Sequence, residues 1–398
     1  MISKSQEISP KNLLKERKQL FIDTVKQTKK PKRVPILSNT FTWMVYDSPY
    51  KLSEAIYDYD KMFEVICNHC EKYDFDLYSV SGARNVLAYS DVFGENCCYI
   101  INDDNYSINY PDSASILKAE EYPIFLQKGL VKYYFEHGIT RKYGLTDRED
   151  IIERFSRAAR EMIKIDEFRD RVKKQFTDVF GVPIFATVVP EFPCDTLFKA
   201  IRGMKGFCTD LRRHTHYVEQ ALEVIDEHFF PILKNSFNKL GNADDVAFPG
   251  GRGISLVHTV LNPKQFGKYH WPYIKRYIDM VVSKNQICSL FLEGSIDLFY
   301  DYLQDLPKGH VALQIEQSDP VDAKKKLPNV TIIGGFPTHF LGKESLEKCL
   351  DKAKEIIDEM AYDGNFIFTT DKMLSFPSDA KSENMLAVVN FVKEYGTF

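Results

Sequence analysis

The last third of the chain alternates between short apolar strands and helical stretches, and this rhythm restricts the fold more than any other feature of the sequence. Strands are expected at residues 254–260, 287–293, 311–316, 330–334 and 366–370. Helical patterns separate most of these strands, and another lies at 381–395. Strands joined by helices run parallel, because each helix returns the chain to the same edge of the sheet. The pattern therefore predicts a parallel sheet covered by helices.

Three apolar segments before this region bring the number of expected strands to eight. They lie at Val34–Leu37, Tyr73–Val80 and Pro183–Val189. Eight strands that alternate with helices are typical of a (β/α)8 TIM barrel, so the predicted fold class is α/β with this architecture. An open doubly wound sheet is the alternative.

One domain is expected, since no linker or internal repeat interrupts the pattern. The barrel should occupy residues 33–398, and residues 1–32 should form a basic helical N-terminal extension. The helix of this extension, near Leu13–Lys26, either packs on the barrel through its apolar side chains or contacts an acidic partner. A β-hairpin is expected from Cys97–Ile101 and Tyr106–Tyr110.

Composition narrows the functional classes. The 52 Lys+Arg and 56 Asp+Glu residues nearly balance and give a formal net charge of −4. A nucleic-acid-binding protein usually carries a basic surplus, so no nucleic-acid partner is expected. The sequence has no membrane-spanning apolar run and no signal-peptide core, so we expect no membrane association and a cytoplasmic location. The eight Cys are then expected to be reduced thiols.

Acidic residues and one histidine stand at or just beyond the expected strand ends. Glu293, Glu316 and Asp371 each end a strand, Asp319 follows the second of these, and His339 follows the strand at 330–334. In a TIM barrel, catalytic groups sit at the carboxyl ends of the strands. Buried carboxyl groups and a His that converge in one cavity are costly unless they bind a metal or exchange protons. The series therefore predicts a functional site at this rim.

Each of these residues alone has a simpler explanation. A carboxylate that follows a strand is a common helix N-cap, and this alternative applies to Asp319 and Asp371 in particular. A single His in such a loop is more often a structural hydrogen-bonding residue than a ligand. The second expected strand adds Asp76 and Tyr78 as further candidates.

A series of short segments in the C-terminal half resembles the uroporphyrinogen decarboxylase superfamily, which includes methyltransferases of corrinoid-dependent methyl transfer. The resemblance covers about residues 33–397 and is clearest from 255 onward. It implies a (β/α)8 barrel, in agreement with the strand and helix pattern. The segments, in chain order, are Pro263–Phe266 with Trp271–Tyr273, Phe291–Gly294, Asp319–Lys324, Ile333–Gly335, Gly364–Thr370 and Glu383–Ala387.

The resemblance is closer to the methyltransferase branch than to true uroporphyrinogen decarboxylases. The latter carry an arginine-rich loop after strand one that holds the carboxylates of the substrate, whereas this chain has Ser38–Tyr46 there, without Arg. The methyltransferases bind zinc with one His and two Cys, and at those positions this chain has Phe291, Glu293 and Asp371. What the resemblance leaves is an oxygen-rich site, in which Glu293, Asp371 and His339 are the candidate ligands of a zinc ion.

The resemblance implies an enzyme that moves a methyl group between a small methylated compound, such as an O-methyl donor, and a corrinoid (cobalamin) carried by a separate protein. Glu293 and Asp371 would be metal ligands or proton donors, and Glu316 and His339 would complete the catalytic site. A homodimer, common in the family, is a further expectation. The candidate substrate-binding residues are Trp43, Asp76, Tyr78 and Asp319.

Two other functions stay open at this point. A decarboxylase acting on a porphyrinogen or another aromatic acid needs cations over the barrel mouth, and Arg84, Arg212, Arg213 and Arg252 are the candidates. Several of them converging on Asp76 would favour it. A non-catalytic binding barrel would instead show strand-end carboxylates that are far apart and salt-bridged.

Overall fold

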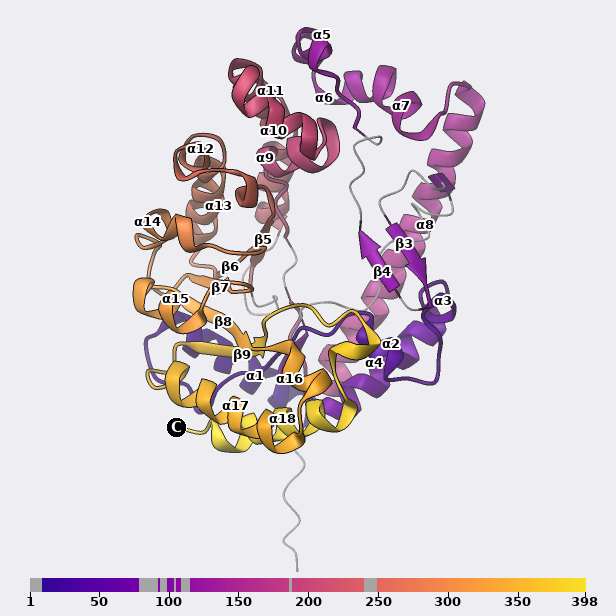
Figure 1. The fold of residues 1–398 in the computed structure, drawn as a ribbon. Helices are drawn as coiled ribbons and strands as arrows, with labels where there is room; N and C mark the ends of the chain where they lie inside the picture. Colours follow the sequence, from indigo (N-terminus) through magenta and orange to yellow (C-terminus); the bar gives the residue numbers. More distant parts are fainter. Residues whose placement is uncertain are drawn as a thin grey trace, which may run out of the picture.

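The computed structural model describes residues 9–78, 92–93, 99–103, 105–108, 115–185, 188–239 and 249–398. Figure 1 shows strands surrounded by helices, with α5–α7 and α10–α11 extending beyond the strands at the top of the view. None of the helices in these ranges combines the length and the apolar character needed to span a bilayer.

The strands follow the cyclic order of a TIM barrel. A parallel sheet has the order β5 (Gly251–Ser255), β6 (Cys288–Leu292), β7 (Val311–Gln314), β8 (Thr331–Phe336) and β9 (Phe366–Thr370). A second parallel pair joins β1 (Leu37–Ser38) to β2 (Leu77–Tyr78).

Two isolated parallel bridges connect these pieces. Ile36 pairs with Phe368, which places the first strand beside the last, and Val188 pairs with Gly251, which places Val188 next to β5. In an open doubly wound sheet the first and last strands are not neighbours, so their pairing favours the barrel. The predicted α/β TIM-barrel class is confirmed. Among the described residues, no pairing is seen between the 183–189 segment and β2.

Helices fill the connections between strands. The hairpin predicted from the sequence is also present as β3 (Tyr99–Asn102) and β4 (Asn105–Ile108), with Cys97 and Cys98 outside the described residues. The helices are α1 (Pro10–Lys26), α2 (Trp43–Tyr46), α3 (Leu52–Ala55), α4 (Tyr59–Tyr73), α5 (Tyr122–Lys128), α6 (Leu130–Tyr133), α7 (Ile139–Tyr143), α8 (Arg148–Lys174), α9 (Pro193–Thr196), α10 (Met204–Arg213), α11 (Thr215–Lys239), α12 (Pro263–Tyr269), α13 (Trp271–Ser283), α14 (Tyr300–Leu303), α15 (Pro320–Lys326), α16 (Thr338–Lys343), α17 (Leu346–Met360) and α18 (Ser382–Tyr395).

The strand expected at 254–260 lies earlier in the chain, at Gly251–Ser255, and residues 257–260 form a 3₁₀ turn. The two glycines of β5 explain the shift. A Cβ at Gly251 would lie 2.5 Å from the Tyr277 hydroxyl, and one at Gly253 would lie 3.1 Å from the Phe192 ring. Aromatic side chains therefore pack directly on the backbone of β5, where a larger residue would not fit.

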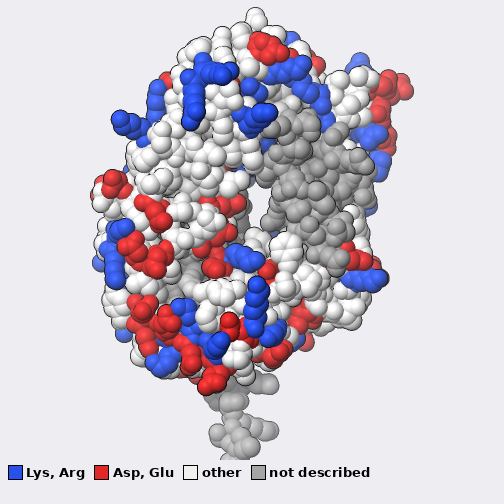
Figure 2. Space-filling model, viewed as in Figure 1, with Lys and Arg blue, Asp and Glu red and all other residues white. Residues whose placement is uncertain are grey.

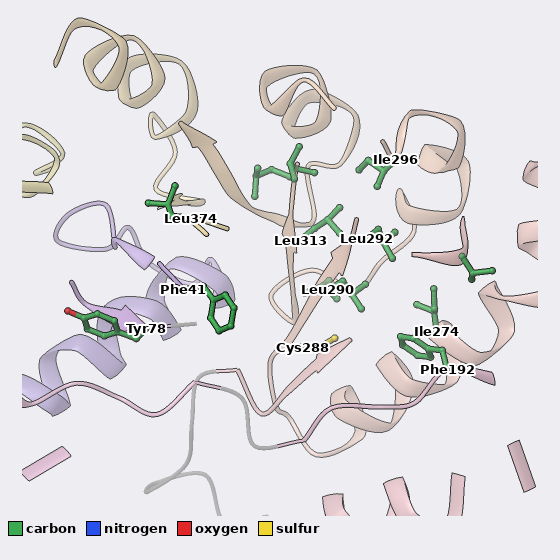
Figure 3. Packing of buried hydrophobic residues seen from close by; sticks show 14 of the residues in the cluster. Phe41, Tyr78, Phe192, Ile274, Cys288, Leu290, Leu292, Ile296, Leu313 and Leu374 are labelled. Atoms are coloured by element: carbon green, nitrogen blue, oxygen red, sulfur yellow. The ribbon is translucent and has the colours of Figure 1, made fainter. Parts of the chain in front are cut away.

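Buried apolar side chains form an outer core, an inner core and a small third cluster of Val92, Phe93, Ile139 and Leu145. The outer core fills the space between strands and helices, and Figure 3 shows Cys288, Leu290 and Leu292 of β6 on the side that faces Ile274 of α13. The inner core lies inside the barrel, because its strand residues alternate with the outer ones. Its members are Phe21, Val25, Leu37, Leu77, Ile287, Ala312, Ile333 and Ile367, with Phe185 packed against them.

Helix α1 closes the amino-terminal end of this barrel. Ser9 caps helix α1. The Phe21 and Val25 side chains of this helix are fully buried among the inward residues of the strands. Arg17 and Arg33 both pair with Asp76, the residue that directly precedes strand β2. The predicted N-terminal helix thus packs on the barrel.

A buried polar network ties helices α9 and α13 to the end of β5. Asp195 Oδ1 accepts hydrogen bonds from the backbone N–H groups of Leu256 and Val257, at 2.8 and 3.0 Å. The Ser255 hydroxyl lies 2.7 Å from His270 Nε2, and Asp195 Oδ2 lies 3.6 Å from the same nitrogen. Asp195 and His270 are both almost fully buried. This network fixes the loop that follows β5.

We predict that replacing Phe21 with Ala destabilises the whole barrel. Removing a fully buried ring leaves a cavity, so Phe21→Ala should lower the free energy of unfolding by about 3–5 kcal/mol in denaturant titrations. The neighbouring Ile22 is 37% exposed, and Ile22→Ala should change the free energy of unfolding by less than about 0.5 kcal/mol. Equal effects of the two substitutions would show that α1 is not part of the core.

We also predict a loss of stability on mild acidification. Burial is the main cause that lowers the pKa of His270 and of His258 to about 4, and that of His69 to about 3. Because the unfolded chain binds protons near pH 6.5, each of these residues contributes full stability above that pH and loses it as the pH falls toward 4. The slope is up to about 1.4 kcal/mol per pH unit for each histidine.

The measurement is the free energy of unfolding between pH 7 and pH 5. The His270→Gln variant should show a shallower slope than the parent protein. The exposed His339 supplies the matched control, and His339→Gln tests the effect of exchanging a surface His for Gln. A parent slope that matches that of His270→Gln would contradict the prediction.

Candidate active site inside the barrel

The inward positions of β5 and β7 are polar above the apolar inner core. Alternation along β5 places Arg252 inward between two outward glycines, and along β7 it places Gln314 inward after Ala312. Arg252 donates from Nη2 to Gln314 Oε1 at 2.7 Å, across the intervening strand β6. Side chains of alternate strands meet in this way within a single layer of a TIM barrel.

Arg252 is a buried cation flanked by two aromatic rings. It is 6% exposed, and its guanidinium carbon lies 5.1 Å from the centre of the Phe185 ring and 5.5 Å from that of Phe291. Burial lowers the pKa of Arg252 to about 10, while attraction from Glu293 acts in the opposite direction. Sequence reasoning had considered Arg252 only for the decarboxylase alternative.

Other polar atoms in this layer have no hydrogen-bond partner among the described residues. They are Arg252 Nη1 and the hydroxyl groups of Ser289 and Thr369. Ser289 is the register partner of Arg252 on β6, and Thr369 lies on β9 at the end of the sheet opposite β5. Both residues are at most 2% exposed. Buried polar groups are normally satisfied, so these atoms are candidates to bind a ligand.

Two of the predicted carboxylates stand together at the rim. Glu293 follows β6, and its backbone N–H donates to the Ser255 carbonyl at 2.9 Å. Glu316 follows β7, and its Oε2 accepts a hydrogen bond from the backbone N–H of Gly294 at 2.5 Å. Both side chains are half-buried. Figure 2 shows that this face of the molecule is hollowed at its centre, and that acidic side chains gather along the edge of the hollow beside β5–β8.

The remaining rim candidates do not join this pair. Asp371 accepts from the backbone N–H of Thr338 at 3.0 Å and from its hydroxyl, so it holds the start of α16. Asp319 is exposed and caps α15 by accepting from the Asp322 N–H at 2.7 Å. His339 is exposed on α16. Asp319 is therefore the N-cap of the helix that follows its strand, whereas Asp371 binds the first residue of α16, a helix that precedes β9.

The residues expected to shape the substrate pocket lie elsewhere. Asp76 is fully buried at the amino-terminal end of β2, where Arg33 binds it with two hydrogen bonds of 2.6 and 2.5 Å. Tyr78 faces the outer core, with its ring 5.3 Å from that of Phe176. Trp43 is also buried in the outer core, and its Nε1 donates to the Ala380 carbonyl at 3.0 Å.

The zinc ligands expected from the resemblance do not fit a metal site. Glu293 is at the rim, Asp371 is bonded to Thr338, and His339 is exposed. Across the described parts of the chain, no three His, Cys, Asp or Glu side chains are grouped so that they could hold a metal ion. We therefore derive no chemical step from zinc bound to these residues.

The cations of the decarboxylase alternative do not converge on Asp76. Arg212 and Arg213 are exposed at the end of α10, Arg252 is inside the barrel, and Arg84 lies outside the described residues. Asp76 pairs instead with Arg33 and Arg17. Of the four candidates, Arg252 is the one that the described structure places in the barrel interior.

Comparison with known proteins identifies the family. Residues 182–395 match the uroporphyrinogen decarboxylase (URO-D) family. Among solved structures, a methyltransferase from Methanosarcina mazei has a similar fold, with a TM-score of 0.60 and 17% sequence identity over 98% of this chain and 99% of that chain. No curated protein matches the chain. Since the matched region exceeds half of the 398 residues, the protein belongs to the uroporphyrinogen decarboxylase family.

Proposed function

We propose that the protein is a methyltransferase that moves a methyl group between a small methylated compound, such as an O-methyl donor, and a corrinoid carried by a separate protein. The observation that carries the proposal is the arrangement of Glu293 and Glu316 at neighbouring strand ends, above an interior that holds the buried guanidinium of Arg252. Family membership and the similar fold of a methyltransferase support it.

The chemistry assigns a proton to Glu293. When the methyl carbon of an ether leaves its oxygen for the acceptor, the bonding pair stays on that oxygen, which must gain a proton. A carboxyl group at the mouth of the barrel can supply it as a general acid. The positive charge of Arg252, which attracts Glu293, then stabilises the carboxylate that is left behind.

Glu316 acts as a positioning residue in this scheme. Its carboxylate binds the N–H of Gly294, whose φ of +84° lies in the left-handed region. A larger residue would adopt that backbone only with strain, so the glycine and Glu316 together fix the turn that presents Glu293. The reverse transfer, from corrinoid to alcohol, would use the Glu293 carboxylate as the base.

A porphyrinogen decarboxylase fits these residues less well. Such a substrate carries many carboxylates, and they need several cations around one pocket. In the described interior, Arg252 is flanked by Phe185 and Phe291 rather than by other cations. One guanidinium between two apolar rings suits a small substrate.

We predict that Glu293→Gln slows methyl transfer by about 10²–10⁴-fold, because the amide cannot donate the proton to the leaving oxygen. The assay follows the formation of methylcobalamin from reduced cobalamin and a panel of small methyl ethers. Asp319→Asn is the control, and it should retain nearly full activity, because Asp319 is exposed and caps α15.

Full activity of Glu293→Gln would contradict the assigned role of Glu293. Release of carbon dioxide from uroporphyrinogen, with no methyl transfer from any ether in the panel, would replace the proposed reaction by the decarboxylase alternative.

A further inference from the structure

The charge of Arg252 is compensated in a different way from those of the other deeply placed cations. Arg17 pairs with Asp74 and Asp76, and Lys324 binds Asp363 at 2.8 Å. Arg252 instead binds the neutral amide of Gln314, and its Nη1 has no hydrogen-bond partner among the described residues. A buried guanidinium has five N–H donors to satisfy, and an unsatisfied one is expensive.

The unsatisfied atoms form a set that matches one ligand group. Arg252 Nη1 offers a charged N–H, and Ser289 and Thr369 offer hydroxyl groups that donate to an oxygen. All three belong to inward positions of the barrel, and they lie above the apolar inner core. A small oxyanion inside the barrel would accept from all of them.

Charge is also ordered along the barrel axis. The cation of Arg252 lies deep, and Glu293 and Glu316 lie at the rim. The cation at the base attracts the charged end of an anionic ligand, and the carboxylates at the rim repel it. We therefore expect such a ligand to lie with its charged end at the base of the barrel. The rings of Phe185 and Phe291 exclude water from the guanidinium, and this strengthens a charge-assisted hydrogen bond.

We propose that Arg252, with Ser289 and Thr369, binds the carboxylate of a small substrate at the base of the barrel, and that the opposite end of that substrate lies at Glu293. The identity of the opposite end as a methyl ether rests on the proposed function. The carboxylate site itself depends only on the side chains of the barrel interior.

The test measures binding by isothermal titration calorimetry. The probes are methoxyacetate, its neutral analogue methoxyacetamide, and inorganic phosphate. The parent protein should bind methoxyacetate, and Arg252→Gln should bind it about 10–100-fold more weakly, since one charge-assisted hydrogen bond is lost. Arg252→Lys, which keeps the charge, should recover part of the affinity. Methoxyacetamide should bind weakly to all three proteins.

Thermal unfolding separates a ligand-binding role from a structural one. If Arg252 is kept for a ligand, removing a buried charge whose described hydrogen bond is to the neutral amide of Gln314 should leave the melting temperature of Arg252→Gln unchanged or higher. A lower melting temperature, or failure to fold, would show that Arg252 is structural and would overturn the proposal. It would also be overturned by equal binding of methoxyacetate to the parent and Arg252→Gln, by no binding to the parent, or by binding of phosphate alone.

Binding and methyl transfer can fail separately. Binding that depends on Arg252, without methyl transfer from any donor, would retain the carboxylate site and reject the proposed reaction. Methyl transfer from methoxyacetate that is unchanged in Arg252→Gln would retain the reaction and reject the site.

Discussion

The parallel register of the strands decides which side chains share the interior of this protein. Because β5 pairs with β6, β6 with β7, and so on to β9, each strand end reaches the same rim, and the bridge between Ile36 and Phe368 brings the first strand to the last. The same register brings Arg252 and Gln314, 62 residues apart in the sequence, into hydrogen-bond contact. A shift of one residue in any strand would turn its inward side chains outward, and the polar side chains of the candidate site would no longer share the barrel interior.

The two ends of the barrel differ in how their polar side chains are paired. At the amino-terminal end, α1 inserts Phe21 and Val25 among inward strand residues, and Arg17 and Arg33 neutralise Asp76. These ion pairs are made within the chain, as expected for a stabilising end. At the carboxyl-terminal end, polar groups remain without partners in the described structure, and the two glutamates at the rim are half-buried. The unsatisfied polar atoms of Arg252, Ser289 and Thr369 on inward positions of the strands indicate where a ligand binds.

The sequence predicted the fold better than the site. Strand β9 was predicted at its observed residues, because a short apolar run between helical patterns is a local signal. Strand β5 was misplaced, because its glycines are required by the packing of Tyr277 and Phe192, which are far away in the sequence. The positions of Glu293 and Glu316 just after strands β6 and β7 were predicted from the sequence. The exposure of His339 could not be predicted because it depends on where α16 begins, and the ion pairs of Asp76 could not be predicted because Arg17 and Arg33 are distant in the sequence. The importance of Arg252 could not be seen before the register of β5 against β7 was known.

The most direct test of this account is a crystal structure of the protein grown with methoxyacetate. The account predicts that the carboxylate lies within hydrogen-bond distance of Arg252 Nη1 and of the Ser289 or Thr369 hydroxyl, with the methoxy group directed toward Glu293. Methoxyacetate bound outside the barrel, or bound inside with its carboxylate away from Arg252, would contradict it.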